Sequence, residues 1–217
     1  MASSVHIGGL FSPIWAYKPH TWWGIGSCKI FGLHVDVHGL EHLESFRDAA
    51  RRGTSGAILA ANHESLFDIF VLAALPFTFS WIAKIQVSRI PFVGTGLRGI
   101  DTFFLQRDGS TKDISTMKVV EDGLRRGASV VIFPEGTRTR TGTMLPLKKG
   151  AFRTSVMAQA PIVPIRIRGT FPIARLGALP HRRGHNVSVH IGPPILPQPE
   201  ESLLSLMDRY LAALKVL

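Results

Sequence analysis

The chain has 217 residues, a length that suits one compact domain, and its single cysteine, Cys28, excludes a disulfide framework and a cysteine-rich zinc site. Hydrophobic residues make up 45% of the sequence and charged residues 18%, which excludes a disordered protein. The formal net charge of +10 predicts an anionic partner, which can be nucleic acid, an anionic membrane or a phosphate-bearing substrate.

Residues 1–32 form an aromatic segment that we predict to be distinct from the domain at 33–217. Three tryptophans and a tyrosine lie between residues 11 and 31, where the only charges are Lys18 and Lys29. Indole rings favour a membrane–water interface, so we interpret the segment as an interfacial helical segment, with a core-packing helix as the alternative. The longest uncharged apolar stretch, 69–83, is shorter than the ~20 residues of a membrane-spanning helix, so we expect none.

Strands and helices are predicted to alternate along the rest of the chain, which indicates an α/β fold with a central β-sheet layer flanked by helices. Alternating or continuous apolar residues predict strands, and apolar residues spaced by three or four predict helices. The predicted strands are 33–37, 57–61, 77–83, 102–105, 129–133, 162–167 and 187–191. The predicted helices are one that begins near Ser65 and those at 110–126, 151–159 and 203–214.

Two patterns that suggest a cofactor or a metal fail on their context. Gly94 to Gly99 has the spacing G-x-G-x-x-G, but a strand-like run follows it where a dinucleotide site needs a helix. Histidines recur every four residues in two places without the acids or cysteines that complete a zinc site, and Phe67 stands where H-E-x-x-H needs its second histidine. We therefore expect neither a nucleotide cofactor nor a bound metal.

A histidine and an aspartate follow the predicted strand at 57–61. His63 comes at the end of this strand, and Asp68 falls in the first turn of the helix that begins near Ser65. The turn between them folds back, so the carboxylate can reach one imidazole nitrogen, fix the tautomer and leave the other nitrogen free to take a proton. The alternative is that Asp68 only caps the helix and that His63 is a buried polar residue.

Basic residues come at or near the ends of several predicted strands. Arg138 follows the strand at 129–133 and offers a planar donor fork to phosphate, while Gly136 permits a close approach of the backbone. Arg107 and Lys84 each close another predicted strand. We expect these groups to converge on one rim of the sheet, where ligands bind in open α/β folds. For each of them alone, a solvated surface cation is the alternative.

With these residues in view, the sequence resembles the glycerolipid acyltransferases, the 1-acylglycerol-3-phosphate acyltransferase family. Asn62 and His63 with Asp68 match the signature N-H-x-x-x-x-D. Further blocks of the family follow in order at 99–107, at 133–138 (Phe-Pro-Glu-Gly-Thr-Arg) and at 160–165, and 81–94 resembles the segment between the first two blocks. The likeness extends from about residue 20 to about residue 195. Gln106 departs from relatives that carry an acid there, which bears on head-group preference.

The resemblance implies transfer of an acyl group from a thioester to the free hydroxyl of 1-acylglycerol-3-phosphate, which gives phosphatidic acid. His63 is then the general base, and Asp68 orients it. The residues expected to hold the acceptor phosphate are Gly136, Thr137 and Arg138, with Glu135 keeping Arg138 in place and Arg107 and Lys84 as second-rank contacts. No cofactor is implied, because coenzyme A or acyl carrier protein brings the donor as a substrate.

The expected partners are a lysophospholipid acceptor, an acyl thioester donor and an anionic membrane surface, at the cytoplasmic face and in peripheral or monotopic association. The run 69–79 is expected to line an acyl slot, with a sheet-packing core as the alternative. Another lysolipid, such as lyso-ornithine lipid, and transacylation between phospholipids stay open as alternatives. A basic nucleic-acid-binding domain is a rival from another class, but the sequence lacks a dense Lys/Arg stripe and aromatic RNA-binding signatures. The intact His63 and Asp68 argue against an inactive relative.

Overall fold

The computed structural model describes residues 4–6, 19–91, 94, 102–105, 111–173 and 184–217. Within these residues one sheet of eight strands has the order β1-β2-β8-β7-β3-β6-β4-β5. The strands are β1 (Ser4–His6), β2 (Leu33–His38), β3 (Ile58–Ala61), β4 (Ser80–Lys84), β5 (Thr102–Leu105), β6 (Val130–Ile132), β7 (Ile162–Arg168) and β8 (His185–Ile191).

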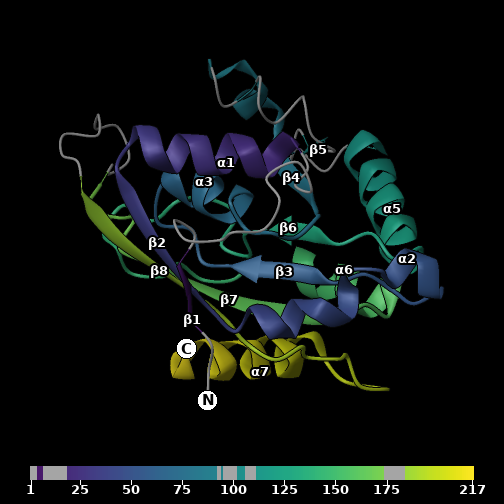
Figure 1. Cartoon of the computed structure of the whole chain (residues 1–217). Coiled ribbons are helices and arrows are strands. Elements are labelled where there is room, and N and C mark those ends of the chain that lie inside the picture. The colour runs from purple at the N-terminus through teal and green to yellow at the C-terminus, as the bar shows by residue number, and fades with distance from the viewer. Residues whose placement is uncertain (1–3, 7–18, 92–93, 95–101, 106–110, 174–183) are drawn as a thin grey trace.

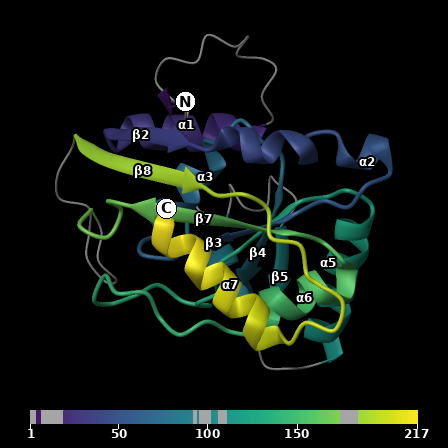
Figure 2. The ribbon, with the colours of Figure 1, turned by 90° about the horizontal axis from the view of Figure 1, so that it is seen from below.

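Helices cover both faces of the sheet, as Figure 1 and the view from below in Figure 2 show. On one face lie α1 (Pro19–Ile30) and α3 (Phe67–Ala73), and the other face carries α5 (Thr111–Arg125), α6 (Gly150–Ala158) and α7 (Leu203–Val216). The shorter helical elements are η3 (Leu40–Phe46), α2 (Ala49–Arg52) and η4 (Ile85–Arg89). The predicted α/β fold with a helix-flanked sheet is thus confirmed.

The centre of the sheet is parallel, and this brings the carboxyl ends of several strands to one edge. β3 pairs in parallel with both β6 and β7, and β4 pairs in parallel with β5 and β6. Among the described strands, the antiparallel pairs are β1 with β2 and β7 with β8. Residues that directly follow β3, β4 and β6 are therefore neighbours in space although they are far apart in the sequence.

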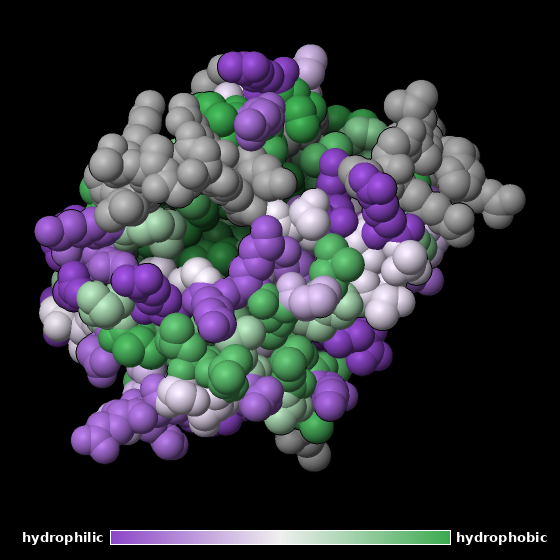
Figure 3. Space-filling model, turned by 180° about the vertical axis from the view of Figure 1, so that it is seen from behind, coloured by the Kyte–Doolittle hydropathy of each residue, from purple (hydrophilic) through white to green (hydrophobic). Residues whose placement is uncertain are grey.

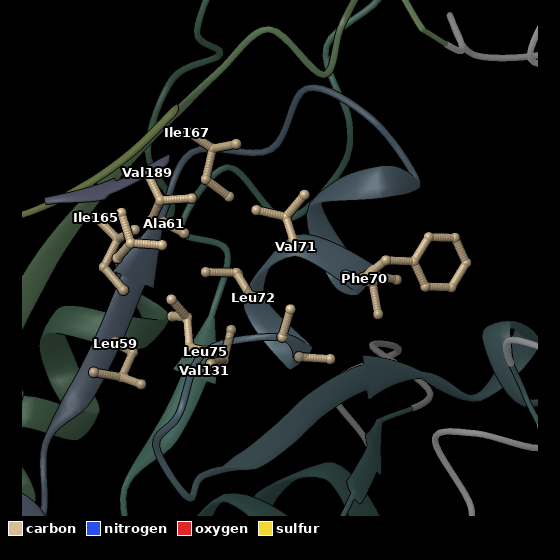
Figure 4. Close-up of a cluster of buried hydrophobic side chains, with 14 of the residues drawn as sticks. Leu59, Ala61, Phe70, Val71, Leu72, Leu75, Val131, Ile165, Ile167 and Val189 are labelled. Atoms are coloured by element: carbon tan, nitrogen blue, oxygen red, sulfur yellow. The ribbon is translucent and has the colours of Figure 1, made fainter. Parts of the chain in front are cut away.

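Buried side chains form one hydrophobic core on each face of the sheet. Successive side chains of a strand point to opposite faces, so Leu59 belongs to the core under α1 and α3, whereas Ile58 belongs to the core under the other helices. α3 is buried along its whole length. Its Val71 and Leu72 lie toward side chains of the central strands in the close-up of Figure 4. The burial of both faces explains why β3 is continuously apolar rather than alternating.

Most predicted elements agree with the structure to within a few residues, and the strand expected at 77–83 is the main exception. β4 begins only at Ser80. The residues before it turn, because Pro76 has no N–H for a strand ladder and the backbone N–H of Phe77 donates to the carbonyl of Leu75 at 2.8 Å. The elements β1, α2, η3 and η4 had no counterpart in the sequence analysis.

Helix α1 both packs on the core and exposes apolar side chains. Trp23 contacts Phe70 of α3 edge-on, with ring centroids 5.1 Å apart. A Cβ on Gly24 would lie 2.3 Å from a backbone nitrogen at the end of α3, so glycine permits this close approach. Trp22 is 36% exposed and Ile30 is 66% exposed. In the described part of the chain, no helix combines the length and the apolar character needed to cross a membrane.

Candidate active site

His63 and Asp68 are joined by a hydrogen bond of 2.8 Å between Nδ1 and Oδ2. The carboxylate is fully buried, and the imidazole keeps 14% of its side-chain surface exposed. Oδ2 also accepts the backbone N–H groups of Glu64 at 2.7 Å and Ser65 at 2.9 Å, which folds the chain back at the start of α3. Asp68 therefore holds the turn that precedes this helix and also orients the histidine. Because a carboxylate only accepts, Nδ1 donates to it and Nε2 carries the lone pair that can take a proton.

Thr170 supplies a further hydrogen bond to the same carboxylate, and no sequence motif indicated it. Its Oγ1 lies 2.5 Å from Asp68 Oδ1, and both residues are fully buried. Thr170 comes two residues after the end of β7, the strand that pairs in parallel with β3. The contact thus depends on a strand pairing between segments about a hundred residues apart, which periodicity in the sequence does not reveal.

The imidazole of His63 stacks on the ring of Phe133, with centroids 3.9 Å apart and planes inclined by 13°. Phe133 directly follows β6, the parallel neighbour of β3, so the two rings meet at the same edge of the sheet. This stack covers one face of the imidazole and, together with the bond to Asp68, fixes the plane of the ring. The hydrogen bond to Asp68 uses Nδ1, and the stack on Phe133 uses one face of the ring. Neither contact occupies Nε2.

The resemblance implies that Glu135 keeps Arg138 in place, but the hydrogen bonds of its carboxylate go to backbone N–H groups, one of them in the turn that carries His63. Glu135 is 2% exposed, and its two carboxylate oxygens accept the backbone N–H groups of His63 at 2.8 Å and Leu145 at 2.6 Å. Burial raises the pKa of Glu135, while the hydrogen bonds from Leu145 and His63 lower it. With both oxygens used by backbone donors, Glu135 acts on the site through the position of His63.

A pocket of about 120 Å³ brings His63 together with Gly136, Thr137 and Arg138. Its remaining walls are apolar and consist of Ile69, Trp81, Ile82, Ala83, Val87 and Phe133. Arg138 is half-buried, and burial lowers its pKa while the charge of Asp68 opposes this shift. Its guanidinium still carries a positive charge at neutral pH. The pocket can therefore accept a molecule with an anionic group near a hydroxyl that faces the imidazole.

The structure describes the other predicted site residues only in part or not at all. Lys84 is the last residue of β4, at the carboxyl edge of the sheet, but its side chain is outside the description. Arg107 and Gln106 also lie outside the described residues. The apolar run at 69–79 is mostly core, and of its residues only Ile69 lines the described pocket. Among described residues, no group of three or more His, Cys, Asp or Glu side chains could hold a metal ion.

Glu64 is a half-buried carboxylate beside His63 and Asp68 that sequence reasoning did not single out. Its Oε1 accepts the side-chain N–H of Asn62 at 3.1 Å, and its carboxylate also accepts the backbone N–H of Phe171. Burial and the nearby charge of Asp68 raise the pKa of Glu64 to about 7, against the opposing charge of Arg166. Glu64 thus titrates near neutral pH, one residue from the imidazole.

The acyltransferase family model matches residues 34–168, which include His63, Asp68 and Arg138. The chain belongs to the acyltransferase family. Its relatives include the chloroplastic 1-acyl-sn-glycerol-3-phosphate acyltransferase BAT2 of Brassica napus, 32% identical over 144 residues that make up 66% of this chain and 40% of the relative. The human 1-acyl-sn-glycerol-3-phosphate acyltransferase beta is 34% identical over 146 residues, which are 66% of this chain and 50% of the relative. The chain thus spans half or less of the length of these two acyltransferases.

A solved structure supports the same family assignment. The crystal structure of the 1-acyl-sn-glycerophosphate acyltransferase PlsC from Thermotoga maritima superposes with a TM-score of 0.75. The superposition covers 91% of this chain and 76% of that one at 25% sequence identity. The similarity therefore includes nearly the whole fold and not only the segment matched by the family model.

The protein has a second, larger apolar pocket next to the first. Its volume is about 360 Å³, and the two pockets share Ile82, Phe133 and Gly136 in their walls. Leu105, Met117 and Ala151 line the rest together with Ile132, Pro134, Gly150 and the side chain of Lys148. Seen from behind, the surface has a hollow with a hydrophobic floor and hydrophilic side chains on its rim (Figure 3). An apolar chain can thus lie next to the pocket that contains His63.

Proposed function

We propose that this acyltransferase moves a fatty acyl group from an acyl thioester to the free hydroxyl of 1-acylglycerol-3-phosphate, giving phosphatidic acid. The observation that carries the proposal is the 2.8 Å bond between His63 and Asp68 inside a pocket that Arg138 also lines. The names of the two relatives support the same acceptor, although the chain spans 40% to 50% of their length. Both substrates are therefore part of the proposal.

In the proposed reaction, Nε2 of His63 removes the proton from the acceptor hydroxyl as the oxygen attacks the thioester carbonyl. A carbon–oxygen bond forms, the carbon–sulfur bond then breaks, and the thiolate leaves and takes the proton back from the imidazolium. The buried charge of Asp68 stabilises that imidazolium and keeps the ring in the productive tautomer. The reaction uses no bound metal or organic cofactor, so chelation with EDTA should leave its rate unchanged.

The phosphate of the acceptor pairs with the guanidinium of Arg138 in this proposal, with Gly136 and Thr137 beside it. Gly136 has φ +74°, a left-handed conformation that favours glycine, and a Cβ there would lie 2.9 Å from the side chain of Lys148. Lys84 and Arg107 stay second-rank candidates for the same phosphate. The apolar pocket that shares Phe133 and Gly136 is the proposed place of an acyl chain.

A lipid surface supplies the acceptor, and we propose that the protein binds it peripherally at the cytoplasmic face. The exposed Trp22 and Ile30 of α1 and the net charge of +10 support binding to an anionic membrane. Flotation with anionic and neutral liposomes tests this: recovery with anionic liposomes should exceed recovery with neutral ones, and the Trp22→Ser/Ile30→Ser variant should float less. Equal recovery of the wild type in the soluble fraction with both lipids contradicts it.

The proposed function is tested by thiol release from an acyl thioester in the presence of lysophosphatidic acid. Release should depend on the acceptor, and His63→Ala should lower it at least ~100-fold. The same assay with coenzyme A and carrier-protein thioesters identifies the donor, and a panel of lysolipids identifies the acceptor. Normal turnover by His63→Ala contradicts the mechanism, whereas turnover only with acceptors that lack phosphate contradicts the acceptor class.

A further inference from the structure

We infer that Thr170 is a positioning residue for the proposed acyl transfer, because its hydroxyl holds the Asp68 carboxylate in the orientation that aligns His63. The kinetic consequences of this inference rest on the proposed function. The contact between Thr170 and Asp68 rests on the geometry alone. Asp68 Oδ2 receives three hydrogen bonds, from His63, Glu64 and Ser65. In the described part of the chain, Oδ1 receives one, from Thr170 Oγ1 at 2.5 Å.

The direction and the length of this bond indicate that it is charge-assisted. An ionised carboxylate only accepts, so the hydroxyl of Thr170 donates. A hydroxyl–carboxylate distance of 2.5 Å lies at the short end of the usual range for such bonds. Both residues are fully buried, so water does not replace the donor when it is removed. In the described part of the chain, loss of the hydroxyl leaves the carboxylate held through Oδ2 alone, so its plane is less firmly oriented toward His63 Nδ1.

A second set of contacts fixes the loop that carries Thr170 against the catalytic turn. The side chain of Asn62 pairs with both backbone groups of Ile167, accepting from its N–H at 2.7 Å and donating to its carbonyl at 2.9 Å. The carboxylate of Glu64 accepts from Asn62 and from the backbone N–H of Phe171, the residue after Thr170. The residues on both sides of Thr170 are thus bound to residues 62 and 64, next to His63.

The backbone before Thr170 is also specified by the structure. Gly169 has φ +94°, and a Cβ on it would lie 2.5 Å from the carbonyl oxygen of Asn186 in β8. Only glycine fits this turn without displacing β8. The loop is therefore a rigid support for the hydroxyl of Thr170.

The experiment compares Thr170→Val with Thr170→Ser and with Ser155→Ala. Valine keeps the shape of threonine without the donor, and serine keeps the donor. Ser155 is the matched control, because it is also fully buried and its Oγ donates to the carbonyl of Ala160 at 2.6 Å, away from the catalytic pair. Thiol-release kinetics, thermal unfolding and the downfield proton signal of His63 Nδ1–H are measured for each variant.

We expect Thr170→Val to lower kcat by ~10-fold to ~100-fold with KM for the acceptor within about twofold, because the imidazole is misplaced while Arg138 is not. Thr170→Ser should restore most of kcat, and Ser155→Ala should lower the unfolding midpoint while it leaves kcat close to the wild-type value. The Nδ1–H signal should shift or broaden in Thr170→Val only.

Two results overturn the inference: a folded Thr170→Val with kcat within about twofold of wild type, or equal losses of kcat in Thr170→Val and Ser155→Ala. Failure of the proposed function is distinct, because it appears as absence of thiol release by the wild type. The Nδ1–H signal decides the positioning in that case, since an unchanged signal in Thr170→Val contradicts it and a changed signal supports it.

Discussion

The carboxylate of Glu135 accepts the backbone N–H of His63 at 2.8 Å and so connects the two sequence blocks that form the pocket. The carbonyl of His63 also accepts the backbone N–H of Thr139 at 3.0 Å. Both backbone groups of His63 are thus used by the segment that carries Arg138. The position of the imidazole relative to the guanidinium is therefore fixed through the backbone and does not depend on a direct contact between the two side chains.

Glu135→Gln should destabilise the protein and slow thiol release together. The amide nitrogen of glutamine cannot accept, so one of the two backbone N–H groups, of His63 or of Leu145, loses its buried partner. An unsatisfied buried donor costs about 1–3 kcal/mol in the free energy of unfolding, measured by urea denaturation. The matched control Glu41→Gln changes an exposed glutamate and should stay within about 0.5 kcal/mol of wild type. Equal stability of the two variants contradicts this account of Glu135.

Arg138→Ala should weaken binding of the acceptor and not binding of the donor. Because the guanidinium lines the pocket with His63, we expect KM for lysophosphatidic acid to rise ~10-fold or more, while KM for the acyl thioester changes by less than about threefold. Arg138→Lys keeps the charge but loses the planar fork, so its loss should be intermediate. Arg140→Ala, an exposed arginine two residues away, is the control. A larger effect on donor KM than on acceptor KM assigns Arg138 to the other substrate.

The sequence predicted the parts of the site that depend on short-range geometry or on a general rule of parallel sheets. Asp68 reaches His63 because five residues and one strand-to-helix turn separate them, and this geometry follows from the local pattern. Gly136 and Arg138 lie in the same pocket as His63 because each block follows a parallel strand. The family resemblance identified the blocks along the sequence. Because they follow parallel strands, the blocks meet at one edge of the sheet.

The features that the sequence did not predict depend on tertiary contacts. Glu135 precedes Arg138 by three residues, and its type alone does not say whether its carboxylate meets a guanidinium or two backbone N–H groups. Thr170 reaches Asp68 only through the pairing of β3 with β7. The apolar run at 69–79 is compatible with a lipid slot and with a core, because both need hydrophobic side chains. The burial of α3 shows that most of this run belongs to the core.

Ala151→Leu should shift the proposed acyl transfer toward shorter acyl chains. Ala151 is 4% exposed and lines the apolar pocket of about 360 Å³ that adjoins the pocket of His63, so a larger side chain there takes volume from it. We expect the ratio of kcat/KM for a sixteen-carbon thioester to that for a ten-carbon thioester to fall at least ~10-fold, since each excluded methylene loses about 0.8 kcal/mol of burial. Ala213→Leu on α7, outside this pocket, is the control. An unchanged ratio places the chain elsewhere.

Glu64→Gln should remove a pH-dependent loss of stability between about pH 4.5 and about pH 7. Burial and the charges of Asp68 and Glu135 raise the pKa of Glu64 from 4.5 to about 7, and Arg166 and the N–H of Phe171 only partly oppose them. A raised folded-state pKa means that the folded protein binds the proton more tightly than the unfolded chain. Its stabilising contribution is therefore complete below the unfolded pKa and is lost as the pH rises through the folded pKa.

Urea denaturation of wild type and Glu64→Gln at half-unit steps from pH 4 to pH 8 measures this contribution. The free energy of unfolding of wild type minus that of the variant should fall across this range and level off above about pH 7.5, because glutamine does not ionise. Glu41→Gln, at an exposed position, should give a difference that is flat with pH. A difference that rises with pH for Glu64→Gln shows instead that the ionised carboxylate stabilises the fold through Asn62 and Phe171.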